Sequence, residues 1–355
     1  MPHTWKGRVR YTLLFFALGT CALSQTNGCV PMNNQQLIIY RAGSLTRAFN
    51  PLVAKFTCET GIQVRDNPMG SVDAGRQITA GGKPCDLYAP ADYLDIDLFL
   101  KPAGYADFNI VFAQGKMVLV YSATSLTEKK LPPIAAPDNP PFHPPASVPN
   151  AAENWYEILT MPGVVIGGGH PYLDPGAYRL DLIFQLAADY YKRPVLHNNL
   201  LQHVTIPGPV RAGATLGKQI DFQFIYEHNA RALAAENADI RYVNLPPEIG
   251  MSDPAMDAWY RQHAAIVLPG LGSPGAARSV TIPAARVAWG ITILKNAPNP
   301  AAAVKFLQML LGPEGAALLE ASGPSPLSPA VVSSDDYRHV PEPLRPLVRE
   351  KAASQ

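Results

Sequence analysis

No other part of this sequence restricts the possible folds as strongly as a strand that ends in a tight turn and leads directly into a helix. An apolar run of strand length, residues 37–40, is followed by Ala42, Gly43 and Ser44, and then by apolar residues at helical spacing. We expect Ser44 to be the N-cap of that helix. A helix start of this kind directs free backbone N–H groups and about half a positive charge at one point, which favours anion binding.

The same unit occurs a second time. Residues 62–64 are the expected strand, residues 66–70 the turn, and Ser71 the cap of a helix that continues through Ile78. A third strand at 85–89 continues the alternation of strands and helices, which predicts a mostly parallel sheet covered on both faces. In such sheets ligands bind at the carboxyl ends of the strands. Both serines lie at that edge, so the sequence predicts a cleft that holds an anion from two directions.

The middle of the chain adds two candidate side chains. Asp174 is followed by Pro175, and this order is a strong signal for a helix start with Asp at the N-cap and Pro at N1. Tyr226 ends the strand that we expect over residues 221–226. The polar residues after Pro329 are expected to form a loosely held tail.

Composition narrows the class of protein. With 355 residues the chain is long enough for two domains, and a formal net charge of +1 gives no basis for nucleic-acid binding. No apolar run reaches the roughly 18 residues that a membrane-spanning helix needs. A proline-rich stretch within 131–149 is expected to be an extended surface excursion. No Cys/His spacing resembles a zinc site, so we expect no resident metal and no cofactor.

The first residues have the pattern of an export signal. A basic segment precedes a short apolar core at 11–20, and Ala22-Leu23-Ser24 fits a cleavage site, so residues 1–24 are predicted to be a signal peptide. The alternative, a membrane anchor, is disfavoured because the apolar core is short. Cys21 follows a poor lipoprotein motif, which leaves a lipid anchor at this cysteine as a second alternative.

Cleavage after Ser24 leaves three cysteines, Cys29, Cys58 and Cys85. An oxidising compartment favours one disulfide among them and one unpaired thiol. We prefer the pair Cys58–Cys85, because the first is expected at the end of a helix and the second at the start of a strand, but the other pairings stay open.

Eight short motifs follow one another between Leu37 and Leu327. They are Ala42-Gly43-Ser44-Leu45-Thr46, Gly70-Ser71, Ala91-Asp92-Tyr93, Asn154-Trp155-Tyr156-Glu157-Ile158-Leu159, Asp174-Pro175 with Tyr178-Arg179, Phe224-Ile225-Tyr226, Leu245-Pro246 with Glu248-Ile249, and Gly290-Ile291-Thr292-Ile293. In this order they resemble the tungstate/molybdate-binding proteins of ABC importers. The resemblance implies the α/β fold of type II periplasmic binding proteins. That fold has two lobes, each a mostly parallel sheet flanked by helices, joined by crossing strands.

The resemblance also suggests how the chain divides into domains. We expect a signal peptide, a linker, a first lobe made of two segments, a second lobe that includes the proline-rich insert, and a tail. The corresponding ranges are 1–24, 25–35, 36–113 plus 246–330, 114–245 with the insert at 131–149, and 331–355.

What the resemblance implies about function is transport rather than catalysis. A periplasmic or otherwise extracytoplasmic protein, expected to be a monomer, would hold molybdate or tungstate between its lobes and deliver it to the permease of an ABC importer. Ser44 and Ser71 match the hydroxyl donors of the family, and Tyr226 matches its tyrosine in the second lobe. Arg179 is expected to be a surface or inter-lobe charge rather than a ligand.

Asp174 matches a carboxylate that, in one branch of the family, binds the metal of the oxyanion and makes it six-coordinate. That branch also uses a glutamate in the second lobe, whereas the corresponding residues 208–213 here contain no acid. We therefore expect tetrahedral binding by neutral donors, with Asp174 as cap of its own helix as the alternative role.

Three other functions stay open. A sulfate-binding or other oxyanion-binding protein is closest to the main interpretation. An anion sensor, or a hydrolase with Ser44 as nucleophile, belongs to a different class, although the sequence around Ser44 lacks the Gly-x-Ser-x-Gly elbow.

Overall fold

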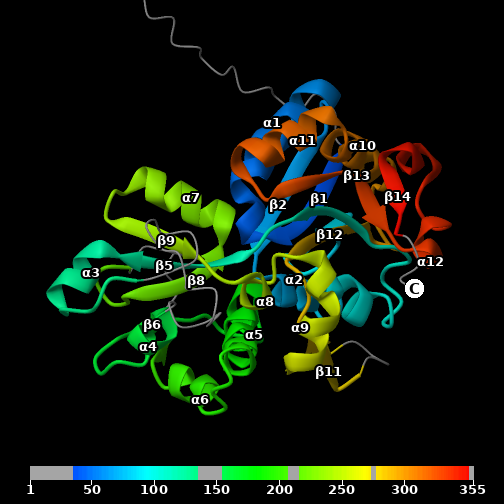
Figure 1. The fold of residues 1–355 in the computed structure, drawn as a ribbon. Helices are drawn as coiled ribbons and strands as arrows, with labels where there is room; N and C mark the ends of the chain where they lie inside the picture. Colours follow the sequence, from blue (N-terminus) through cyan, green and yellow to red (C-terminus); the bar gives the residue numbers. More distant parts are fainter. Residues whose placement is uncertain (1–34, 135–153, 207–215, 273–276, 352–355) are drawn as a thin grey trace, which may run out of the picture.

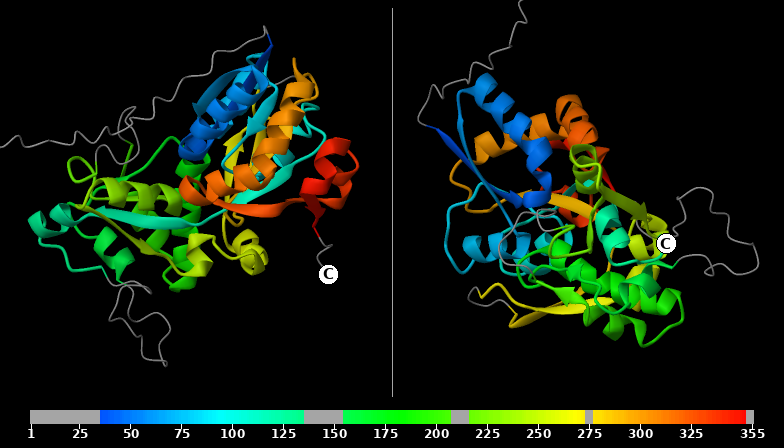
Figure 2. Two further views of the ribbon diagram at one scale, coloured as in Figure 1. Left: turned by 90° about the horizontal axis from the view of Figure 1, so that it is seen from above. Right: turned by 90° about the vertical axis from the view of Figure 1, so that its left-hand side faces the viewer.

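The computed structural model describes residues 35–134, 154–206, 216–272 and 277–351, and the descriptions below concern these residues. Two β-sheets with their helices form the two halves that are visible in Figure 1 and in the left view of Figure 2. One sheet has seven strands in the order β14-β13-β4-β12-β3-β1-β2, and the other has five in the order β7-β6-β8-β5-β9. The chain therefore has the two-lobed α/β fold class predicted from its sequence.

The seven-stranded sheet contains both of the expected strand–turn–helix units. Its strands are β1 (Gln36–Ala42), β2 (Gln63–Met69), β3 (Leu87–Ala89), β4 (Ile110–Gln114), β12 (Ala288–Ile293), β13 (Ser325–Val332) and β14 (Val348–Glu350). The helical segments of this half are η1 (Gly43–Leu45), α1 (Thr46–Thr60), α2 (Ser71–Ile78), η2 (Ile96–Leu100), α10 (Pro300–Leu311), α11 (Pro313–Ser322), α12 (Ser334–Tyr337) and η4 (Glu342–Leu347).

The five-stranded sheet is formed by the middle of the chain. Its strands are β5 (Met117–Ser122), β6 (Ile166–Gly167), β7 (Val204–Thr205), β8 (Phe222–Tyr226) and β9 (Ile240–Asn244), with helices α3 (Ala123–Glu128), α4 (Trp155–Leu159), α5 (Pro175–Tyr190), α6 (Leu196–Leu201) and α7 (Glu227–Glu236). The return to the first sheet passes through α8 (Pro247–Gly250), η3 (Pro254–Met256), α9 (Asp257–His263) and a ribbon of β10 (Ala265–Pro269) and β11 (Ser279–Pro283).

The sheets are mixed, whereas the sequence predicted mostly parallel ones. Strands β1, β2 and β3 pair in parallel, because helical crossovers connect them. Strands β4 and β12 pair antiparallel with each other, and β12 also pairs antiparallel with β3. The reason is that the chain passes through the five-stranded sheet between β4 and β12, so no helical crossover within one sheet sets their direction. Strand β5 is likewise antiparallel to both of its neighbours.

The core of the first half follows from the apolar pattern of α1 and α10. Phe49, Leu52 and Phe56 of α1 are buried, as are Phe306 and Leu310 of α10. The ring of Phe306 lies 5.9 Å from that of Phe49 and 5.3 Å from that of Phe56, measured between centroids. The two helices thus pack against each other through the faces that their helical spacing predicts.

No single helix among the described residues is long and apolar enough to span a membrane. Helices α10 and α11 pass such a test of length and composition only when taken together, and they are bent by 62° with respect to each other.

The prediction of a loosely held tail after Pro329 is wrong. Strand β13 pairs with β4, and β14 pairs in parallel with β13. The chain end therefore completes the seven-stranded sheet. Leu344 and Val348 are buried there. Asp336 is buried too, and its carboxylate accepts a hydrogen bond from the backbone N–H of Asn109 at 2.9 Å. The sequence did not predict this ordered segment, because its buried residues are separated by several exposed polar ones.

The preferred disulfide is also wrong. Cys85 is a free, buried thiol, whereas Cys58 is disulfide-bonded. Burial raises the pKa of the Cys85 thiol well above its usual value, so this residue behaves as a small apolar side chain. Cys21 and Cys29, the predicted signal peptide at 1–24, the linker at 25–35 except Gln35, and most of the proline-rich insert lie outside the described residues.

Candidate functional site

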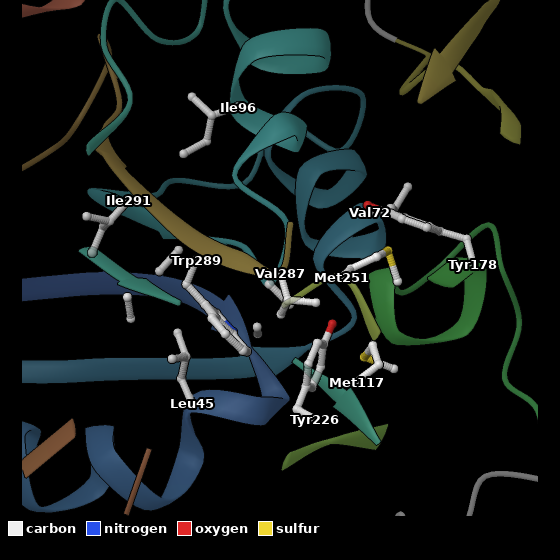
Figure 3. Packing of buried hydrophobic residues seen from close by; sticks show 14 of the residues in the cluster. Leu45, Val72, Ile96, Met117, Tyr178, Tyr226, Met251, Val287, Trp289 and Ile291 are labelled. Carbon is white, nitrogen blue, oxygen red and sulfur yellow. The ribbon is translucent and has the colours of Figure 1, made fainter. Parts of the chain in front are cut away.

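The four side chains singled out from the sequence come from four different elements. Ser44 lies in η1 directly after β1, and Ser71 begins α2 after β2. Asp174 precedes α5, and Tyr226 ends β8 in the other half of the molecule. Figure 3 shows that Tyr226 lies beside Trp289 of β12, with Val72 of α2 and Tyr178 of α5 nearby. The site is therefore built where the two halves meet.

Ser44 does not cap its helix as the sequence predicted. It lies inside a 3-10 turn, whose tighter winding moves the helix start to Thr46, so its side chain is free for a tertiary partner. The indole Nε1–H of Trp289 donates a hydrogen bond to Ser44 Oγ at 3.0 Å. The backbone carbonyl of Ser44 accepts a second hydrogen bond from Nε2 of His228 at 2.9 Å. Ser44 is thus held from both halves.

Ser71 also begins its helix without capping it. The N-cap residue of α2 is Gly70, and Ser71 is the first helical residue, fully buried. Its Oγ accepts a hydrogen bond from the backbone N–H of Ala91 at 3.0 Å, and its carbonyl accepts one from the hydroxyl of Tyr88 at 2.8 Å. Ser71 is therefore fixed by the loop that follows β3.

Asp174 is the N-cap of α5, as predicted. Its Oδ1 accepts a hydrogen bond from the backbone N–H of Gly176 at 2.7 Å, with Pro175 at the start of the helix. Burial raises the pKa of the Asp174 carboxyl above its usual value, although the Gly176 N–H and the Arg179 guanidinium act in the opposite direction.

Tyr226 is buried at the end of β8, and its hydroxyl has a cationic partner. Nη1 of Arg179 donates a hydrogen bond to the Tyr226 hydroxyl oxygen at 2.7 Å. The ring lies 4.9 Å from that of Trp289 between centroids. Burial raises the pKa of the Tyr226 hydroxyl, so this group keeps its proton at neutral pH.

The three hydroxyls share one hydrogen-bonding pattern. Each accepts a hydrogen bond from a protein N–H: Ser44 from Trp289, Ser71 from Ala91 and Tyr226 from Arg179. None of these three hydroxyls donates its own proton to another group among the described residues. Because a hydroxyl has one proton to donate, each keeps that donor for a further acceptor.

A buried ion pair lies beside the hydroxyls. Nη2 of Arg179 is 3.1 Å from Oδ2 of Asp92, and both side chains are almost completely inaccessible to solvent. The hydroxyl of Tyr178 donates to the same Asp92 oxygen at 2.8 Å. Burial, together with the charge of Asp92, raises the pKa of Asp95 well above its usual value. This cluster compensates most of its own charge, so the site offers an anion mainly neutral donors.

The two halves touch closely next to Ser71. The backbone N–H of Asp73 donates to the carbonyl oxygen of Leu173 at 3.1 Å, and Nη1 of Arg76 donates to the carbonyl oxygen of Tyr172 at 2.5 Å. A Cβ placed on Gly70 would lie 2.4 Å from the Leu173 oxygen. Only glycine therefore permits α2 to approach the loop before α5 this closely.

Sequence reasoning missed two residues that organise the site. Trp289 is fully buried in β12, and His228 lies in the first turn of α7 with its ring 5.4 Å from that of Trp289. Trp289 directly precedes the Gly290-Ile291-Thr292-Ile293 motif, which was the available signal. Nothing in the sequence around His228 marks it as a partner of Ser44, since the two are far apart along the chain.

Comparisons with known proteins show the family of this chain. Residues 37–324 match the family described as bacterial extracellular solute-binding protein. The molybdate/tungstate-binding protein WtpA of Thermococcus kodakarensis is 30% identical over 366 residues, which cover 95% of this chain and 94% of that protein.

Two solved structures share the fold at low identity. The periplasmic molybdate-binding protein of Azotobacter vinelandii has a TM-score of 0.52 at 17% identity and covers 81% of this chain and 98% of its own. The sulfate-binding protein SubI of Mycobacterium tuberculosis has a TM-score of 0.54 at 16% identity and covers 82% of this chain and 87% of its own. These two likenesses concern the fold alone.

Proposed function

Since the chain belongs to the bacterial extracellular solute-binding protein family, we propose that it captures a tetrahedral oxyanion, molybdate or tungstate, between its two halves. In this proposal Ser44, Ser71 and Tyr226 donate hydrogen bonds to the oxyanion. Asp174 lines the same site and orders the first turn of α5. The protein then delivers its ligand to the permease of an ABC importer and acts as a monomer.

The observation that carries this proposal is the shared pattern of the three hydroxyls. Each oxygen accepts from an N–H donor and no described residue accepts its proton, and the three hydroxyls come from both halves of the molecule. A dianion that leaves water needs its hydration replaced by oriented donors. Hydrogen bonds to a charged group contribute roughly 1.5–3 kcal/mol each, so a few of them suffice for tight binding without a matching cation.

Asp174 fits this proposal as the cap of α5 rather than as a ligand of the metal. Burial raises the pKa of its carboxyl, and its Oδ1 is engaged with Gly176. The prediction of tetrahedral rather than six-coordinate binding rests on residues 208–213, which lie outside the described residues. We retain it as a prediction, which X-ray absorption spectroscopy of the molybdate complex tests through the number of oxygen neighbours at the metal.

Sulfate is the second candidate ligand. A site of neutral donors accepts any tetrahedral dianion by charge, and the fold is shared with a sulfate-binding protein at a TM-score of 0.54. A hydrolase is less well supported, because Nε2 of His228 donates to the Ser44 carbonyl and does not accept from its hydroxyl. This imidazole is therefore not placed as the general base that a serine nucleophile needs.

The location and the domain limits complete the proposal. We propose that residues 1–24 are a signal peptide that is removed on export, and that a lipid anchor at Cys21 is the alternative fate of the N-terminus. The mass of the mature protein distinguishes the two. We further propose lobes at 36–113 plus 246–330 and at 114–245, with the chain end contributing β14 to the first.

Thermal unfolding with a panel of anions tests the proposed function. Molybdate and tungstate should raise the midpoint by mass action, because they bind only the folded protein. Phosphate and sulfate are included in the panel as competing tetrahedral anions. A shift with sulfate alone would replace the main proposal by the alternative, and no shift with any anion would contradict both.

A further inference from the structure

Arg179 is buried where the two halves of the molecule meet, and only 1% of its side chain is exposed. It lies in the first turns of α5, in the half of the five-stranded sheet. The sequence suggested a surface or inter-lobe charge. The surface alternative is wrong, and the inter-lobe position raises the question of what this guanidinium does there.

The guanidinium joins groups from both halves. Its Nη1 donates to the hydroxyl of Tyr226 at 2.7 Å and to the carbonyl oxygen of Ala91 at 2.9 Å, and its Nη2 is 3.1 Å from Oδ2 of Asp92. Tyr226 ends β8 of the five-stranded sheet, whereas Ala91 and Asp92 follow β3 of the seven-stranded sheet. One side chain thus bridges the two sheets with three contacts.

The same bridge reaches a second hydroxyl of the proposed site. The peptide group that precedes the Ala91 carbonyl donates its N–H to Ser71 Oγ at 3.0 Å. Ala91 therefore contacts Arg179 through its carbonyl and Ser71 through its N–H, and so lies between the two hydrogen-bonded groups. The hydroxyls of Tyr226 and Ser71 belong to different halves.

Resting on the proposed oxyanion-binding function, we propose that Arg179 is a positioning residue: it donates to the Tyr226 oxygen so that the hydroxyl directs its own proton to the ligand, and contacts from the other half fix the guanidinium when the two halves are closed. In that closed arrangement Asp92 and Ala91 hold the guanidinium against the tyrosine oxygen. Arg179 and Tyr226 belong to the same half and move together when the halves separate, but the guanidinium then loses Ala91 and Asp92, the partners that fix its orientation. Closure therefore fixes the group that orients the tyrosine proton.

Arginine suits this task better than lysine. Its planar group offers five N–H donors in a fixed geometry, enough for a hydroxyl, a carbonyl and a carboxylate together. A lysine ammonium retains the charge, but it is a compact point charge at the end of a flexible stem and reaches fewer fixed partners. Asp92 compensates the charge of Arg179, so the proposal does not require Arg179 to contact the oxyanion.

A double-mutant cycle with Arg179→Lys and Tyr226→Phe tests this inference by calorimetric titration with molybdate or tungstate. Tyr226→Phe should weaken binding roughly 10- to 100-fold, the range for one hydrogen bond to a charged group, and Arg179→Lys about 2- to 12-fold, the range for one orienting hydrogen bond. The double variant should bind no more than about two-fold more weakly than the weaker single variant, because Arg179 acts through the tyrosine hydroxyl.

Arg47→Lys is the matched control. Arg47 of α1 also pairs across the two halves, with Glu236 of α7 at 2.6 Å, but both side chains are exposed. Exposed ion pairs contribute little, so this variant should bind within about two-fold of the wild type. Urea unfolding of each ligand-free variant separates loss of binding from loss of folding.

Additive effects of Arg179→Lys and Tyr226→Phe, or unchanged binding by Arg179→Lys, would overturn the inference. If the lysine variant does not fold, Asp92→Asn takes its place in the cycle, since it loosens the guanidinium without removing it. Coupling of Asp92→Asn to Tyr226→Phe supports the inference, and additivity contradicts it. A wild-type protein that binds none of the anions contradicts the proposed function instead, so the two failures are distinguishable.

Discussion

At the scale of single residues, the three hydroxyls of the candidate site are oriented by partners of different kinds. Ser71 accepts from a backbone N–H, Ser44 from an indole, and Tyr226 from a guanidinium. The backbone donor is fixed by the loop after β3, whereas the two side-chain donors can be removed by substitution. The contribution of donor orientation can therefore be measured separately at Ser44 and Tyr226.

Trp289→Phe removes the N–H that occupies Ser44 Oγ and keeps most of the buried ring. We expect oxyanion affinity to fall by about 2- to 12-fold, because the net contribution of one hydrogen bond is roughly 0.5–1.5 kcal/mol. Ser44→Ala should cost more, roughly 10- to 100-fold, because it removes the proposed bond to the charged ligand itself. Calorimetric titration measures both.

The same substitution in the Ser44→Ala background serves as the control. There Trp289→Phe should have little further effect on affinity, since the hydroxyl on which the indole acts is gone. An equal loss in both backgrounds would assign Trp289 a packing role, through its contact with the ring of Tyr226, and would contradict the orientation argument.

His228 predicts a pH dependence of stability. Burial lowers the pKa of its imidazole to about 4 from an unfolded value of 6.5, and its Nε2–H donates to the Ser44 carbonyl. Because the unfolded chain takes up this proton first, stability is full above pH 6.5 and falls as the pH is lowered to 4. The loss amounts to about 3 kcal/mol by pH 4.

Comparison with His228→Gln isolates that contribution, because glutamine keeps an N–H donor and does not titrate. Between pH 7 and pH 4, urea unfolding should show that the wild type loses about 3 kcal/mol more stability than the variant. Asp95 and Asp174 have raised pKa values, which change stability in the opposite direction, but they are common to both proteins. Identical pH profiles would contradict this prediction.

At the scale of elements, the approach of α2 to the loop before α5 is set by Gly70. A Cβ at this position would lie 2.4 Å from the carbonyl oxygen of Leu173 and 3.3 Å from Cβ of Asp174. Both atoms belong to the other half of the molecule. Gly70→Ala should therefore hinder closure while leaving each half folded, and oxyanion affinity should fall by at least about ten-fold.

Two measurements check the Gly70 prediction. Titration calorimetry should show the loss of affinity, and urea unfolding without ligand should show a change of no more than about 1 kcal/mol, since the glycine has an ordinary negative φ of −62°. A large loss of ligand-free stability with unchanged affinity would mean that the contact supports the fold rather than closure.

The helices and strands that carry the site could be predicted better than the residues at which those helices begin. The strand before Ser44, the helix start at Asp174 and the strand end at Tyr226 follow from local patterns, and the structure contains all three. The roles of Ser44 and Ser71 as caps did not hold, because a 3-10 turn and a glycine N-cap changed the helix starts by one or two residues. Local sequence does not fix a helix start that closely.

Partners that are distant along the chain could not be predicted from the sequence. Trp289 lies 245 residues from Ser44, and Arg179 lies 88 residues from Ala91. In the local sequence Trp289 belongs to an apolar strand and Arg179 to a helix. The polar contacts of Trp289 depend on the pairing of β12 with β4, and those of Arg179 depend on the position of α5. The same holds for the chain end, whose strand β14 needs β13 as its template.

At the scale of the whole molecule, the arrangement implies that ligand binding and closure stabilise both halves together. The hydroxyls come from the seven-stranded half (Ser44, Ser71) and the five-stranded half (Tyr226), so an oxyanion held by all three acts as a cross-link. At a ligand concentration 100 times the Kd, the free energy of unfolding should rise by about 2.7 kcal/mol.

Hydrogen exchange locates this stabilisation. Molybdate should slow exchange of backbone amides at the start of α1, at the start of α2, in the first turn of α5 and after β8, which are segments of both halves. Tyr226→Phe should reduce the protection in α5 and after β8 more than that next to β1. Protection confined to one half would show that the ligand binds an open molecule, because a closed site cannot order one wall without the other.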